Sequence, residues 1–263
     1  MHKGVLTKMR TEFGSPIDYF LQLGEEELHM NKLLGEHVKI NFTGFQCLNC
    51  GGERKIFRMG HCYDCFYKMP QTADWVIRPE LSKAHLGEED RDLAYEEKVQ
   101  LTPHIVYLAL SSNVKVGVTR KSQVPTRWID QGATAALEII EAPNRYLAGI
   151  AEVALKKFVA DKTNWRKMLK NDIDTADLFE FRDKLSEFIP EEVQPYFLSE
   201  ENEQWELNFP VQQYPDKIKS LNLAKTPQFE ERLVGIKGQY LIFDKDIVFN
   251  VRGNEGLVIE LDV

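Results

Sequence analysis

The sequence predicts an α+β protein that combines strand-rich ends, a small mixed sheet with helices in the middle of the chain, and a compact four-cysteine zinc module. Apolar and alternating runs near both ends of the 263 residues are typical of β-strands. In the middle, two adjacent strand-like runs precede segments with helical spacing. All four cysteines lie within 19 residues. We expect six segments, at residues 1–46, 47–70, 71–103, 104–171, 172–225 and 226–263.

The two ends of the chain are expected to form strands that pair with each other. The expected strands cover residues 4–9, 17–23 and 37–42 near the N-terminus and 233–243, 247–251 and 257–261 near the C-terminus. The last three indicate a β-meander. Because an isolated three-stranded sheet is only marginally stable, we expect both ends to combine into one β-barrel or sandwich.

The four cysteines form two CxxC pairs, in CLNCGG and HCYDCF, separated by 11 residues. Thiolates from Cys47, Cys50, Cys62 and Cys65 match the tetrahedral preference of Zn²⁺, and a site filled by four protein ligands is structural. Disulfides or a redox CxxC are the alternative, but the N-terminus carries no secretory signal that would favour disulfides. His61 is an alternative ligand, although an outer-sphere or surface position fits it better.

Charge is distributed unevenly along the chain. The net charge is −8, which by itself argues mildly against a nucleic-acid binder. Between residues 113 and 170, however, eleven Lys and Arg accompany only five Asp and Glu, and acidic blocks lie at 88–97 and 172–206. The middle of the chain can therefore attract polyanions. Three cations between the cysteine pairs can also contact phosphates, although a solvated loop is an equal interpretation. They are Arg54, Lys55 and Arg58.

Residues 104–171 carry the clearest succession of elements. In order, we expect strands over 105–110 and 114–119, a helix from Pro125, a strand over 135–141, a helix from Asn144 and a short helix over 165–169. The first two strands, joined by turn-forming residues 111–113, should form a hairpin. Residues 71–103 are expected to be an irregular connector with one helix, and 172–225 an acidic, partly helical segment.

Residues 105–170 resemble the GIY-YIG nuclease superfamily in the order of these elements and in two short motifs. Ile105-Val106-Tyr107 stands where that superfamily has GIY, and Lys115-Val116-Gly117 where it has YIG. Arg127 lies on the next helix, like the superfamily's arginine, and Glu152 lies on the later helix, like its metal-binding glutamate. Over nearly its whole length the chain also resembles a bacterial family, domain-of-unknown-function family 2797, in the stretches HIVYLALSSNVKVGVTR, RWIDQGA and DKTNWRKMLK.

The resemblance implies a Mg²⁺-dependent phosphodiesterase that acts on DNA or RNA. Glu152 would hold a Mg²⁺ that keeps most of its waters. Arg127 would stabilise the transition state with its planar fork, and Lys115 would contact a phosphate. Tyr107 would orient or deprotonate the attacking water with help from the metal, since its free pKa is about 10. Lys115 replaces a tyrosine of the superfamily, and it is a poor general base unless its pKa falls.

Three of these four residues also have a purely structural interpretation. Tyr107 can be a core aromatic and Arg127 an ordinary residue at a helix start, while Glu152 projects off the apolar stripe of its helix, as a solvated side chain does. A non-catalytic, zinc-containing module that grips DNA or RNA through phosphates is therefore the alternative function. A protein-interaction scaffold built on the acidic 172–206 segment is a third.

Three further side chains are candidates for contacts or chemistry. Trp128 and Trp165 could stack on bases, although buried helix aromatics are the plainer interpretation. His104 could act as an acid or base. No apolar run reaches the roughly 18–20 residues that a membrane helix needs, and the N-terminus has no signal-like apolar region. We therefore expect a cytoplasmic protein without membrane contacts.

Overall fold

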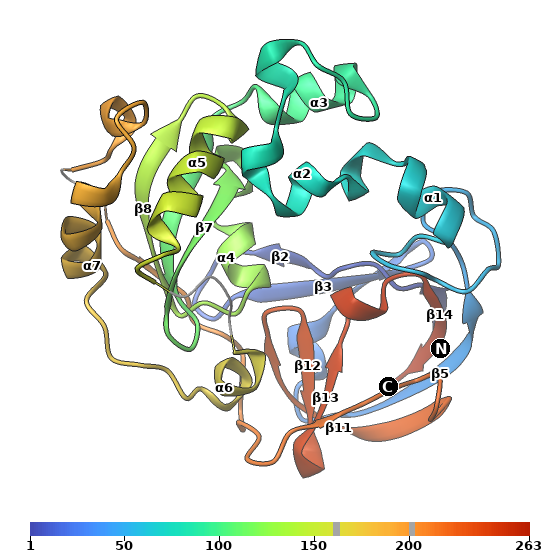
Figure 1. The fold of residues 1–263 in the computed structure, drawn as a ribbon. Coiled ribbons are helices and arrows are strands. Elements are labelled where there is room, and N and C mark those ends of the chain that lie inside the picture. The colour runs from blue at the N-terminus through green and yellow to red at the C-terminus, as the bar shows by residue number, and fades with distance from the viewer. Residues whose placement is uncertain (160–163, 200–202) are drawn as a thin grey trace. The chain divides into compact units, whose positions relative to one another are not determined.

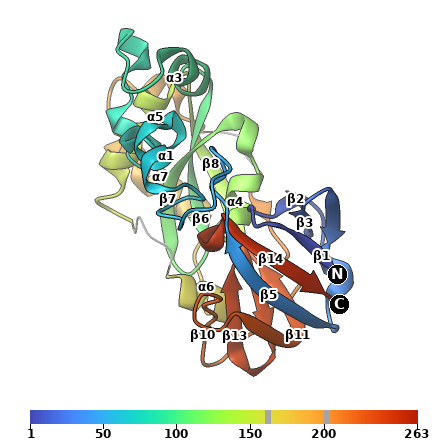
Figure 2. The ribbon, with the colours of Figure 1, turned by 90° about the vertical axis from the view of Figure 1, so that its right-hand side faces the viewer.

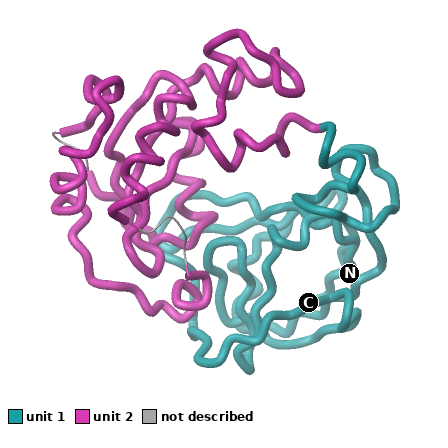
Figure 3. The backbone as a smooth tube through the Cα atoms, in the orientation of Figure 1, with its two compact units in different colours: residues 1–68, 208–263 teal, residues 69–207 magenta. Residues whose placement is uncertain are grey.

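The computed structural model describes residues 1–159, 164–199 and 203–263, which form two compact units (Figure 3). Unit 1 consists of residues 1–68 and 208–263, so it joins the two ends of the chain. Unit 2 consists of residues 69–207. The mixture of sheets and helices agrees with the predicted α+β class.

Unit 1 is built on a seven-stranded sheet in which both ends of the chain take part. The sheet order is β1 (His2–Val5), β14 (Leu257–Asp262), β5 (His37–Phe45), β11 (Gln228–Lys237), β12 (Tyr240–Phe243), β13 (Ile247–Asn250) and β10 (Lys219–Ser220). β14 lies between β1 and β5 and is antiparallel to both; Figure 2 shows it running alongside β5. The expected pairing of the two ends is therefore present.

Two expectations about this sheet are wrong. Its edge strands β1 and β10 do not pair with each other in the described residues, so the sheet is open and no closed barrel forms. The run over 233–243 is not one strand, because the chain turns at Gly238, which has a φ of 62°, and β11 and β12 form an antiparallel hairpin. The meander then ends at β13, and β14 crosses to pair with β5.

A second, three-stranded sheet of unit 1 has the order β2 (Arg10–Glu12), β3 (Asp18–Leu23) and β4 (Glu26–His29). Alternate residues of β3 are buried, as the period of a strand with one covered face requires. The cysteine segment follows β5 and ends in the short helix α1 (Tyr63–Lys68).

Unit 2 contains a four-stranded antiparallel sheet that confirms the predicted hairpin. Its order is β7 (Val114–Arg120), β6 (His104–Leu110), β8 (Ala135–Ala142) and β9 (Trp205–Glu206). The accompanying helices are α4 (Thr126–Asp130), α5 (Arg145–Leu155), α6 (Trp165–Lys170) and α7 (Leu178–Leu185). The helices expected from Pro125, from Asn144 and near 165–169 are all present.

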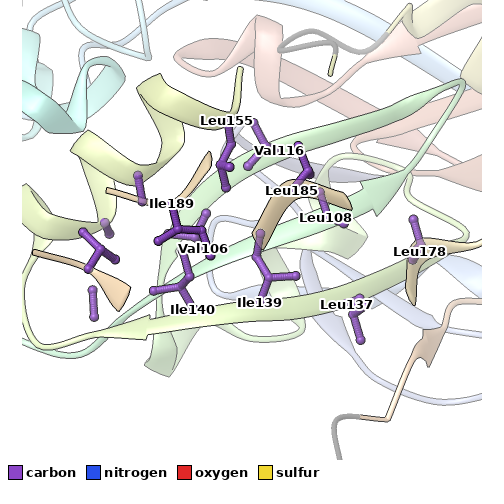
Figure 4. Packing of buried hydrophobic residues seen from close by; sticks show 14 of the residues in the cluster. Val106, Leu108, Val116, Leu137, Ile139, Ile140, Leu155, Leu178, Leu185 and Ile189 are labelled. Carbon is purple, nitrogen blue, oxygen red and sulfur yellow. The ribbon is translucent and has the colours of Figure 1, made fainter. Parts of the chain in front are cut away.

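One face of the unit 2 sheet forms a hydrophobic core with α5 and α7. Val106, Leu108 and Val116 point from β6 and β7 into a buried cluster that includes Leu155 of α5 and Leu185 of α7 (Figure 4). Figure 1 shows α5 lying across these strands. Side chains on the other face of β6 and β7 are therefore separate from this core.

The segment before the hairpin is more ordered than an irregular connector. It contains α2 (Asp74–Ile77), α3 (Leu93–Gln100) and three short 3₁₀ turns. The turn at 79–81 packs directly on α5 at Gly149, where an added Cβ would lie 2.4 Å from the Glu80 nitrogen. Arg145 ties the same segment down by donating hydrogen bonds to the carbonyls of Trp75 and Val76, at 3.1 and 2.7 Å.

Candidate functional site

The second face of the β6–β7 hairpin carries two of the predicted site residues. Tyr107 pairs with Gly117, and Lys115 lies two residues before Gly117, so both side chains point to the same face. The Trp128 ring packs edge-on against Tyr107 at a centroid distance of 5.7 Å. This contact brings α4, which also carries Arg127, onto that face.

Tyr107 is a buried, neutral phenol. Burial raises its pKa, and Glu152 raises it further, whereas Arg127 and a hydrogen bond with Gln131 lower it. The Tyr107 hydroxyl donates to Gln131 Oε1 at 3.1 Å. At neutral pH this side chain therefore acts as a hydrogen-bond donor rather than as a phenolate.

Lys115 is almost completely buried, with only 6% of its surface exposed. Burial lowers its pKa to about 7, and repulsion from Arg127 acts in the same direction. A lysine with a pKa near the working pH can both accept and release a proton. The condition under which this lysine could serve as a general base is therefore met.

Glu152 is buried, which contradicts the expectation of a solvated side chain: only 8% of its surface is exposed. Burial raises its pKa, and Glu80 adds to this effect, while Lys156 and Arg145 oppose it. Lys156 Nζ lies 3.4 Å from Oε1, whereas Oε2 has no hydrogen-bond partner in the described residues. The turn that contains Glu80 packs on α5 at Gly149 and covers this part of the helix.

These side chains belong to one electrostatic cluster with an excess of positive charge. Arg145 connects its parts, because its pKa responds to charges on several elements. Burial lowers the Arg145 pKa to about 10. The carboxylates of Glu152 and Glu80 act to raise that pKa, whereas the charges of Arg127 and Arg120 act to lower it. The cluster thus joins five cations with two carboxylates. Its members are Lys115, Arg120, Arg127, Arg145, Lys156, Glu80 and Glu152.

Sequence reasoning missed three contributors to this cluster. Gln131 lies in the stretch RWIDQGA, whose likeness to family 2797 marked it without indicating its contact with Tyr107. Arg145 counted only as one of the eleven cations between residues 113 and 170. Glu80 belongs to the segment expected to be an irregular connector. The small residue Gly149 was the available indication that another backbone approaches α5 closely.

Two of the three remaining candidates in unit 2, His104 and Trp128, have structural positions. Burial lowers the pKa of His104 to about 4, with Arg145 and Arg120 acting in the same direction and a hydrogen bond to the Thr102 carbonyl opposing them. His104 is therefore neutral at pH 7. Trp128 is fully buried and has no surface on which a base could stack. Trp165 is half-buried, with the Arg166 guanidinium 4.2 Å from its ring centroid.

The four cysteines of unit 1 are arranged as a metal site requires. Their Sγ atoms all lie within 4.8 Å of one another, and Cys50 Sγ is 4.0 Å from Cys62 Sγ. Four sulfurs bound at about 2.3 Å to a tetrahedral Zn²⁺ would be separated by about 3.8 Å. Two N–H groups already donate to this sulfur cluster, from the Cys62 backbone to Cys47 and from the Asn49 side chain to Cys65, both at 3.3 Å.

The chemistry of the donor set also fits a cation. Burial opposes ionisation of Cys47, but hydrogen bonds from the backbone of Cys50, Cys62 and Asn49 outweigh it and lower the pKa to about 6. For Cys65 the hydrogen bond from Asn49 favours the thiolate, yet burial and the neighbouring thiols raise the pKa to about 11. Thiols this close cannot all ionise unless a cation balances their charge. This arrangement could hold Zn²⁺.

His61 is not part of the sulfur cluster. It is buried, and its Nδ1 forms a hydrogen bond with the Met59 carbonyl. In the described part of the chain, the four cysteines are the only group of three or more His, Cys, Asp or Glu side chains arranged to hold a metal. This favours the outer-sphere interpretation of His61.

Comparison with protein families identifies where this chain belongs. The model of the family described as "Protein of unknown function (DUF2797)" matches residues 35–259. The chain belongs to the DUF2797 family. No curated protein and no solved structure matches it. The match spans parts of both units of this DUF2797 protein, from β5 and the cysteine module to β14.

The described helices of this DUF2797 protein are all too short or too polar to cross a membrane.

Proposed function

We propose that unit 2 of this DUF2797 protein is a metal-dependent phosphodiesterase that acts on DNA or RNA through Tyr107, Lys115, Arg127 and Glu152. One observation carries the proposal: Arg127 of α4 acts electrostatically on both Tyr107 and Lys115, and Glu152 of α5 acts on both Tyr107 and Arg145, within a group of side chains in which positive charge predominates. The sheet order β7-β6-β8 and the helices that follow support the resemblance to GIY-YIG nucleases. The cluster is the stronger support, because a fold alone does not define an activity.

Glu152 is the group best suited to anchor a divalent cation. Its Oε2 is buried and has no hydrogen-bond partner in the described residues, while Lys156 lies beside the other oxygen. A Mg²⁺ anchored by one carboxylate would take its other ligands from water and phosphate. Such an ion would neutralise charge on the phosphoryl oxygens and acidify a bound water.

The other three residues would bind and position the reacting groups. Arg127 is half-buried and would bind phosphate oxygens with its planar guanidinium. Lys115, with a pKa of about 7, would accept a proton from the attacking water. Tyr107 would stay protonated and donate a hydrogen bond, since burial raises its pKa. This assignment moves water activation from Tyr107, where the resemblance had put it, to Lys115.

A cleavage assay with and without Mg²⁺ tests the proposal on single-stranded, duplex and branched DNA and on structured RNA. The wild type should cut at least one substrate in a Mg²⁺-dependent manner. Glu152→Gln should slow cutting about 100-fold or more, as expected when a group that acts in the transition state is lost. Glu191→Gln, an exposed carboxylate of the same unit, is the matched control and should cut normally. Unchanged cutting by Glu152→Gln, or no cutting of any substrate, would overturn the assignment.

One observation favours non-catalytic nucleic-acid binding as the second candidate function. The Glu152 Oε2 atom is buried, so a metal ion can reach it only if the covering segment moves. A binding module needs no such movement. It would bind DNA or RNA with an affinity that falls steeply as salt rises, because neutralised phosphates release counterions. Binding without cleavage in the same assay would favour this alternative.

A further inference from the structure

The outer surface of the cysteine module carries aromatic rings that the fold leaves in solvent. Phe57 is 41% exposed, Tyr63 60% and Tyr67 53%. They contact one another: Phe57 and Tyr63 have centroids 5.2 Å apart, and Tyr63 and Tyr67 4.8 Å apart. Phe66 is half-buried and contacts both Phe57 and Tyr67. Contiguous exposed rings of this kind mark interaction sites more often than ordinary surface.

The residues around these rings include several cations that form no ion pair with any carboxylate in the described part of the chain. Residues 53–68 contain four Lys and Arg and two Asp and Glu. Arg54 forms an ion pair with Asp64, with a guanidinium nitrogen 2.9 Å from a carboxylate oxygen. Among the described residues, no carboxylate lies within ion-pair distance of the three remaining cations, and the Arg58 guanidinium is 5.6 Å from the Phe57 ring centroid. The three are Lys55, Arg58 and Lys68.

We propose that the cysteine module is a stacking platform for single-stranded nucleic acid, in which Phe57, Tyr63 and Tyr67 receive bases and Lys55, Arg58 and Lys68 receive phosphates. Exposed rings beside unpaired cations match the two components of an unpaired strand, its base faces and its backbone charge. A duplex hides its base faces in the stack and could use only the cations. A folded protein partner would have to match a positive surface within a chain of net charge −8.

This inference rests on the proposed function only in taking nucleic acid as the ligand. It requires neither hydrolysis nor a metal at Glu152. Stacking and phosphate contacts also make different predictions, because an abasic oligonucleotide keeps the charges and loses the rings. The two parts of the platform can therefore be tested separately with the same full-length protein.

The experiment measures binding of fluorescent oligo-deoxythymidine, and of an abasic oligomer of equal length, to the zinc-loaded full chain. Tyr63→Ala and Tyr67→Ala should each weaken binding of oligo-deoxythymidine about 5- to 100-fold, the usual loss for one stacked base. Neither change should affect the abasic oligomer. Lys55→Ala and Arg58→Ala should weaken both ligands and lower the salt slope by about one each. Tyr67→Phe, which keeps the ring, should bind like the wild type.

Matched controls separate the platform from general surface effects. Phe188→Ala removes an exposed ring of unit 2, and Lys217→Ala removes an exposed cation outside the module; neither should change binding. Zinc content and thermal unfolding verify that each variant is folded. The platform is overturned if the wild type binds no oligonucleotide or if both tyrosine variants bind normally. Loss of cutting in Glu152→Gln together with normal binding by the tyrosine variants would leave the proposed function standing and remove the platform. Weakened binding by the tyrosine variants, with no cutting by the wild type, would support the platform and overturn the proposed function.

Discussion

Gly117 on β7 lies directly opposite Tyr107 on β6, and a Cβ added to Gly117 would sit 2.7 Å from the Tyr107 hydroxyl oxygen. Position 117 therefore requires glycine, because the Tyr107 ring from the neighbouring strand occupies the space that a side chain would need. Its lack of a side chain leaves room for the phenol, whose hydroxyl donates to Gln131 Oε1 at 3.1 Å. Two positions of the YIG-like and GIY-like motifs are therefore linked by packing.

Gly117→Ala should disturb this packing. Because the methyl group would overlap the phenol, we expect the free energy of unfolding to fall by about 1–3 kcal/mol, the usual effect of overpacking a core. Urea unfolding measures the change, and the cost should be smaller in a Tyr107→Phe background, which lacks the closest atom. Gly44→Ala is the matched control on a strand, since nothing lies within 4 Å of its added Cβ. Equal costs at both glycines would contradict the explanation.

Local sequence patterns predicted most individual elements of this fold. The hairpin of β6 and β7, and the starts of α4 and α5, follow from alternation, turn residues and helix-start residues that lie next to each other in the chain. The prediction of a closed barrel was wrong because sheet closure depends on strand pairing between segments far apart in the chain. β14 pairs with β5, more than 200 residues away, as well as with β1, and no residue near β14 indicates that choice.

The site residues divide in the same way. Tyr107 and Lys115 share a face because strands alternate, and this can be read from the sequence. The burial of Glu152 could not be predicted from the sequence, because its position off the apolar stripe of α5 suggested a solvated side chain. That burial depends on a segment about 70 residues earlier, which packs on Gly149 and is held by Arg145. Contacts of this kind carry no local pattern.

Loss of one cysteine should abolish metal binding by the module. We expect the purified chain to contain about one zinc ion and Cys62→Ser to contain almost none, because a structural site needs all four ligands. Metal analysis and release of zinc to a coloured chelator measure this. His61→Asn is the matched control: it alters a buried neighbour outside the sulfur cluster and should keep the zinc. Loss of zinc in His61→Asn but not in Cys62→Ser would show that the ligand set is wrong.

The buried lysine of β7 should make stability depend on pH. The Lys115 pKa is about 7 in the folded chain and 10.5 when unperturbed. The unfolded chain therefore binds more protons than the folded chain between these values, and stability gained from this group rises with pH across that window. Below pH 7 the charged ammonium is buried and the cost is complete. Removing the charge should then stabilise the protein most at low pH.

Lys115→Met tests this directly, because methionine keeps the volume of the side chain and has no charge. We expect it to raise the free energy of unfolding by roughly 1–4 kcal/mol at pH 6, in the range found when buried charges are replaced by apolar residues. The gain should shrink between pH 7 and 10.5. Lys157→Met, which changes an exposed lysine of the same unit, should produce no such trend. Chemical denaturation of both variants at several pH values gives the comparison, and a gain that does not vary with pH would contradict the buried, proton-exchanging state of Lys115. If the wild type also cleaves faster as the pH rises through about 7 and this variant does not, one lysine would explain both the stability cost and the proton transfer.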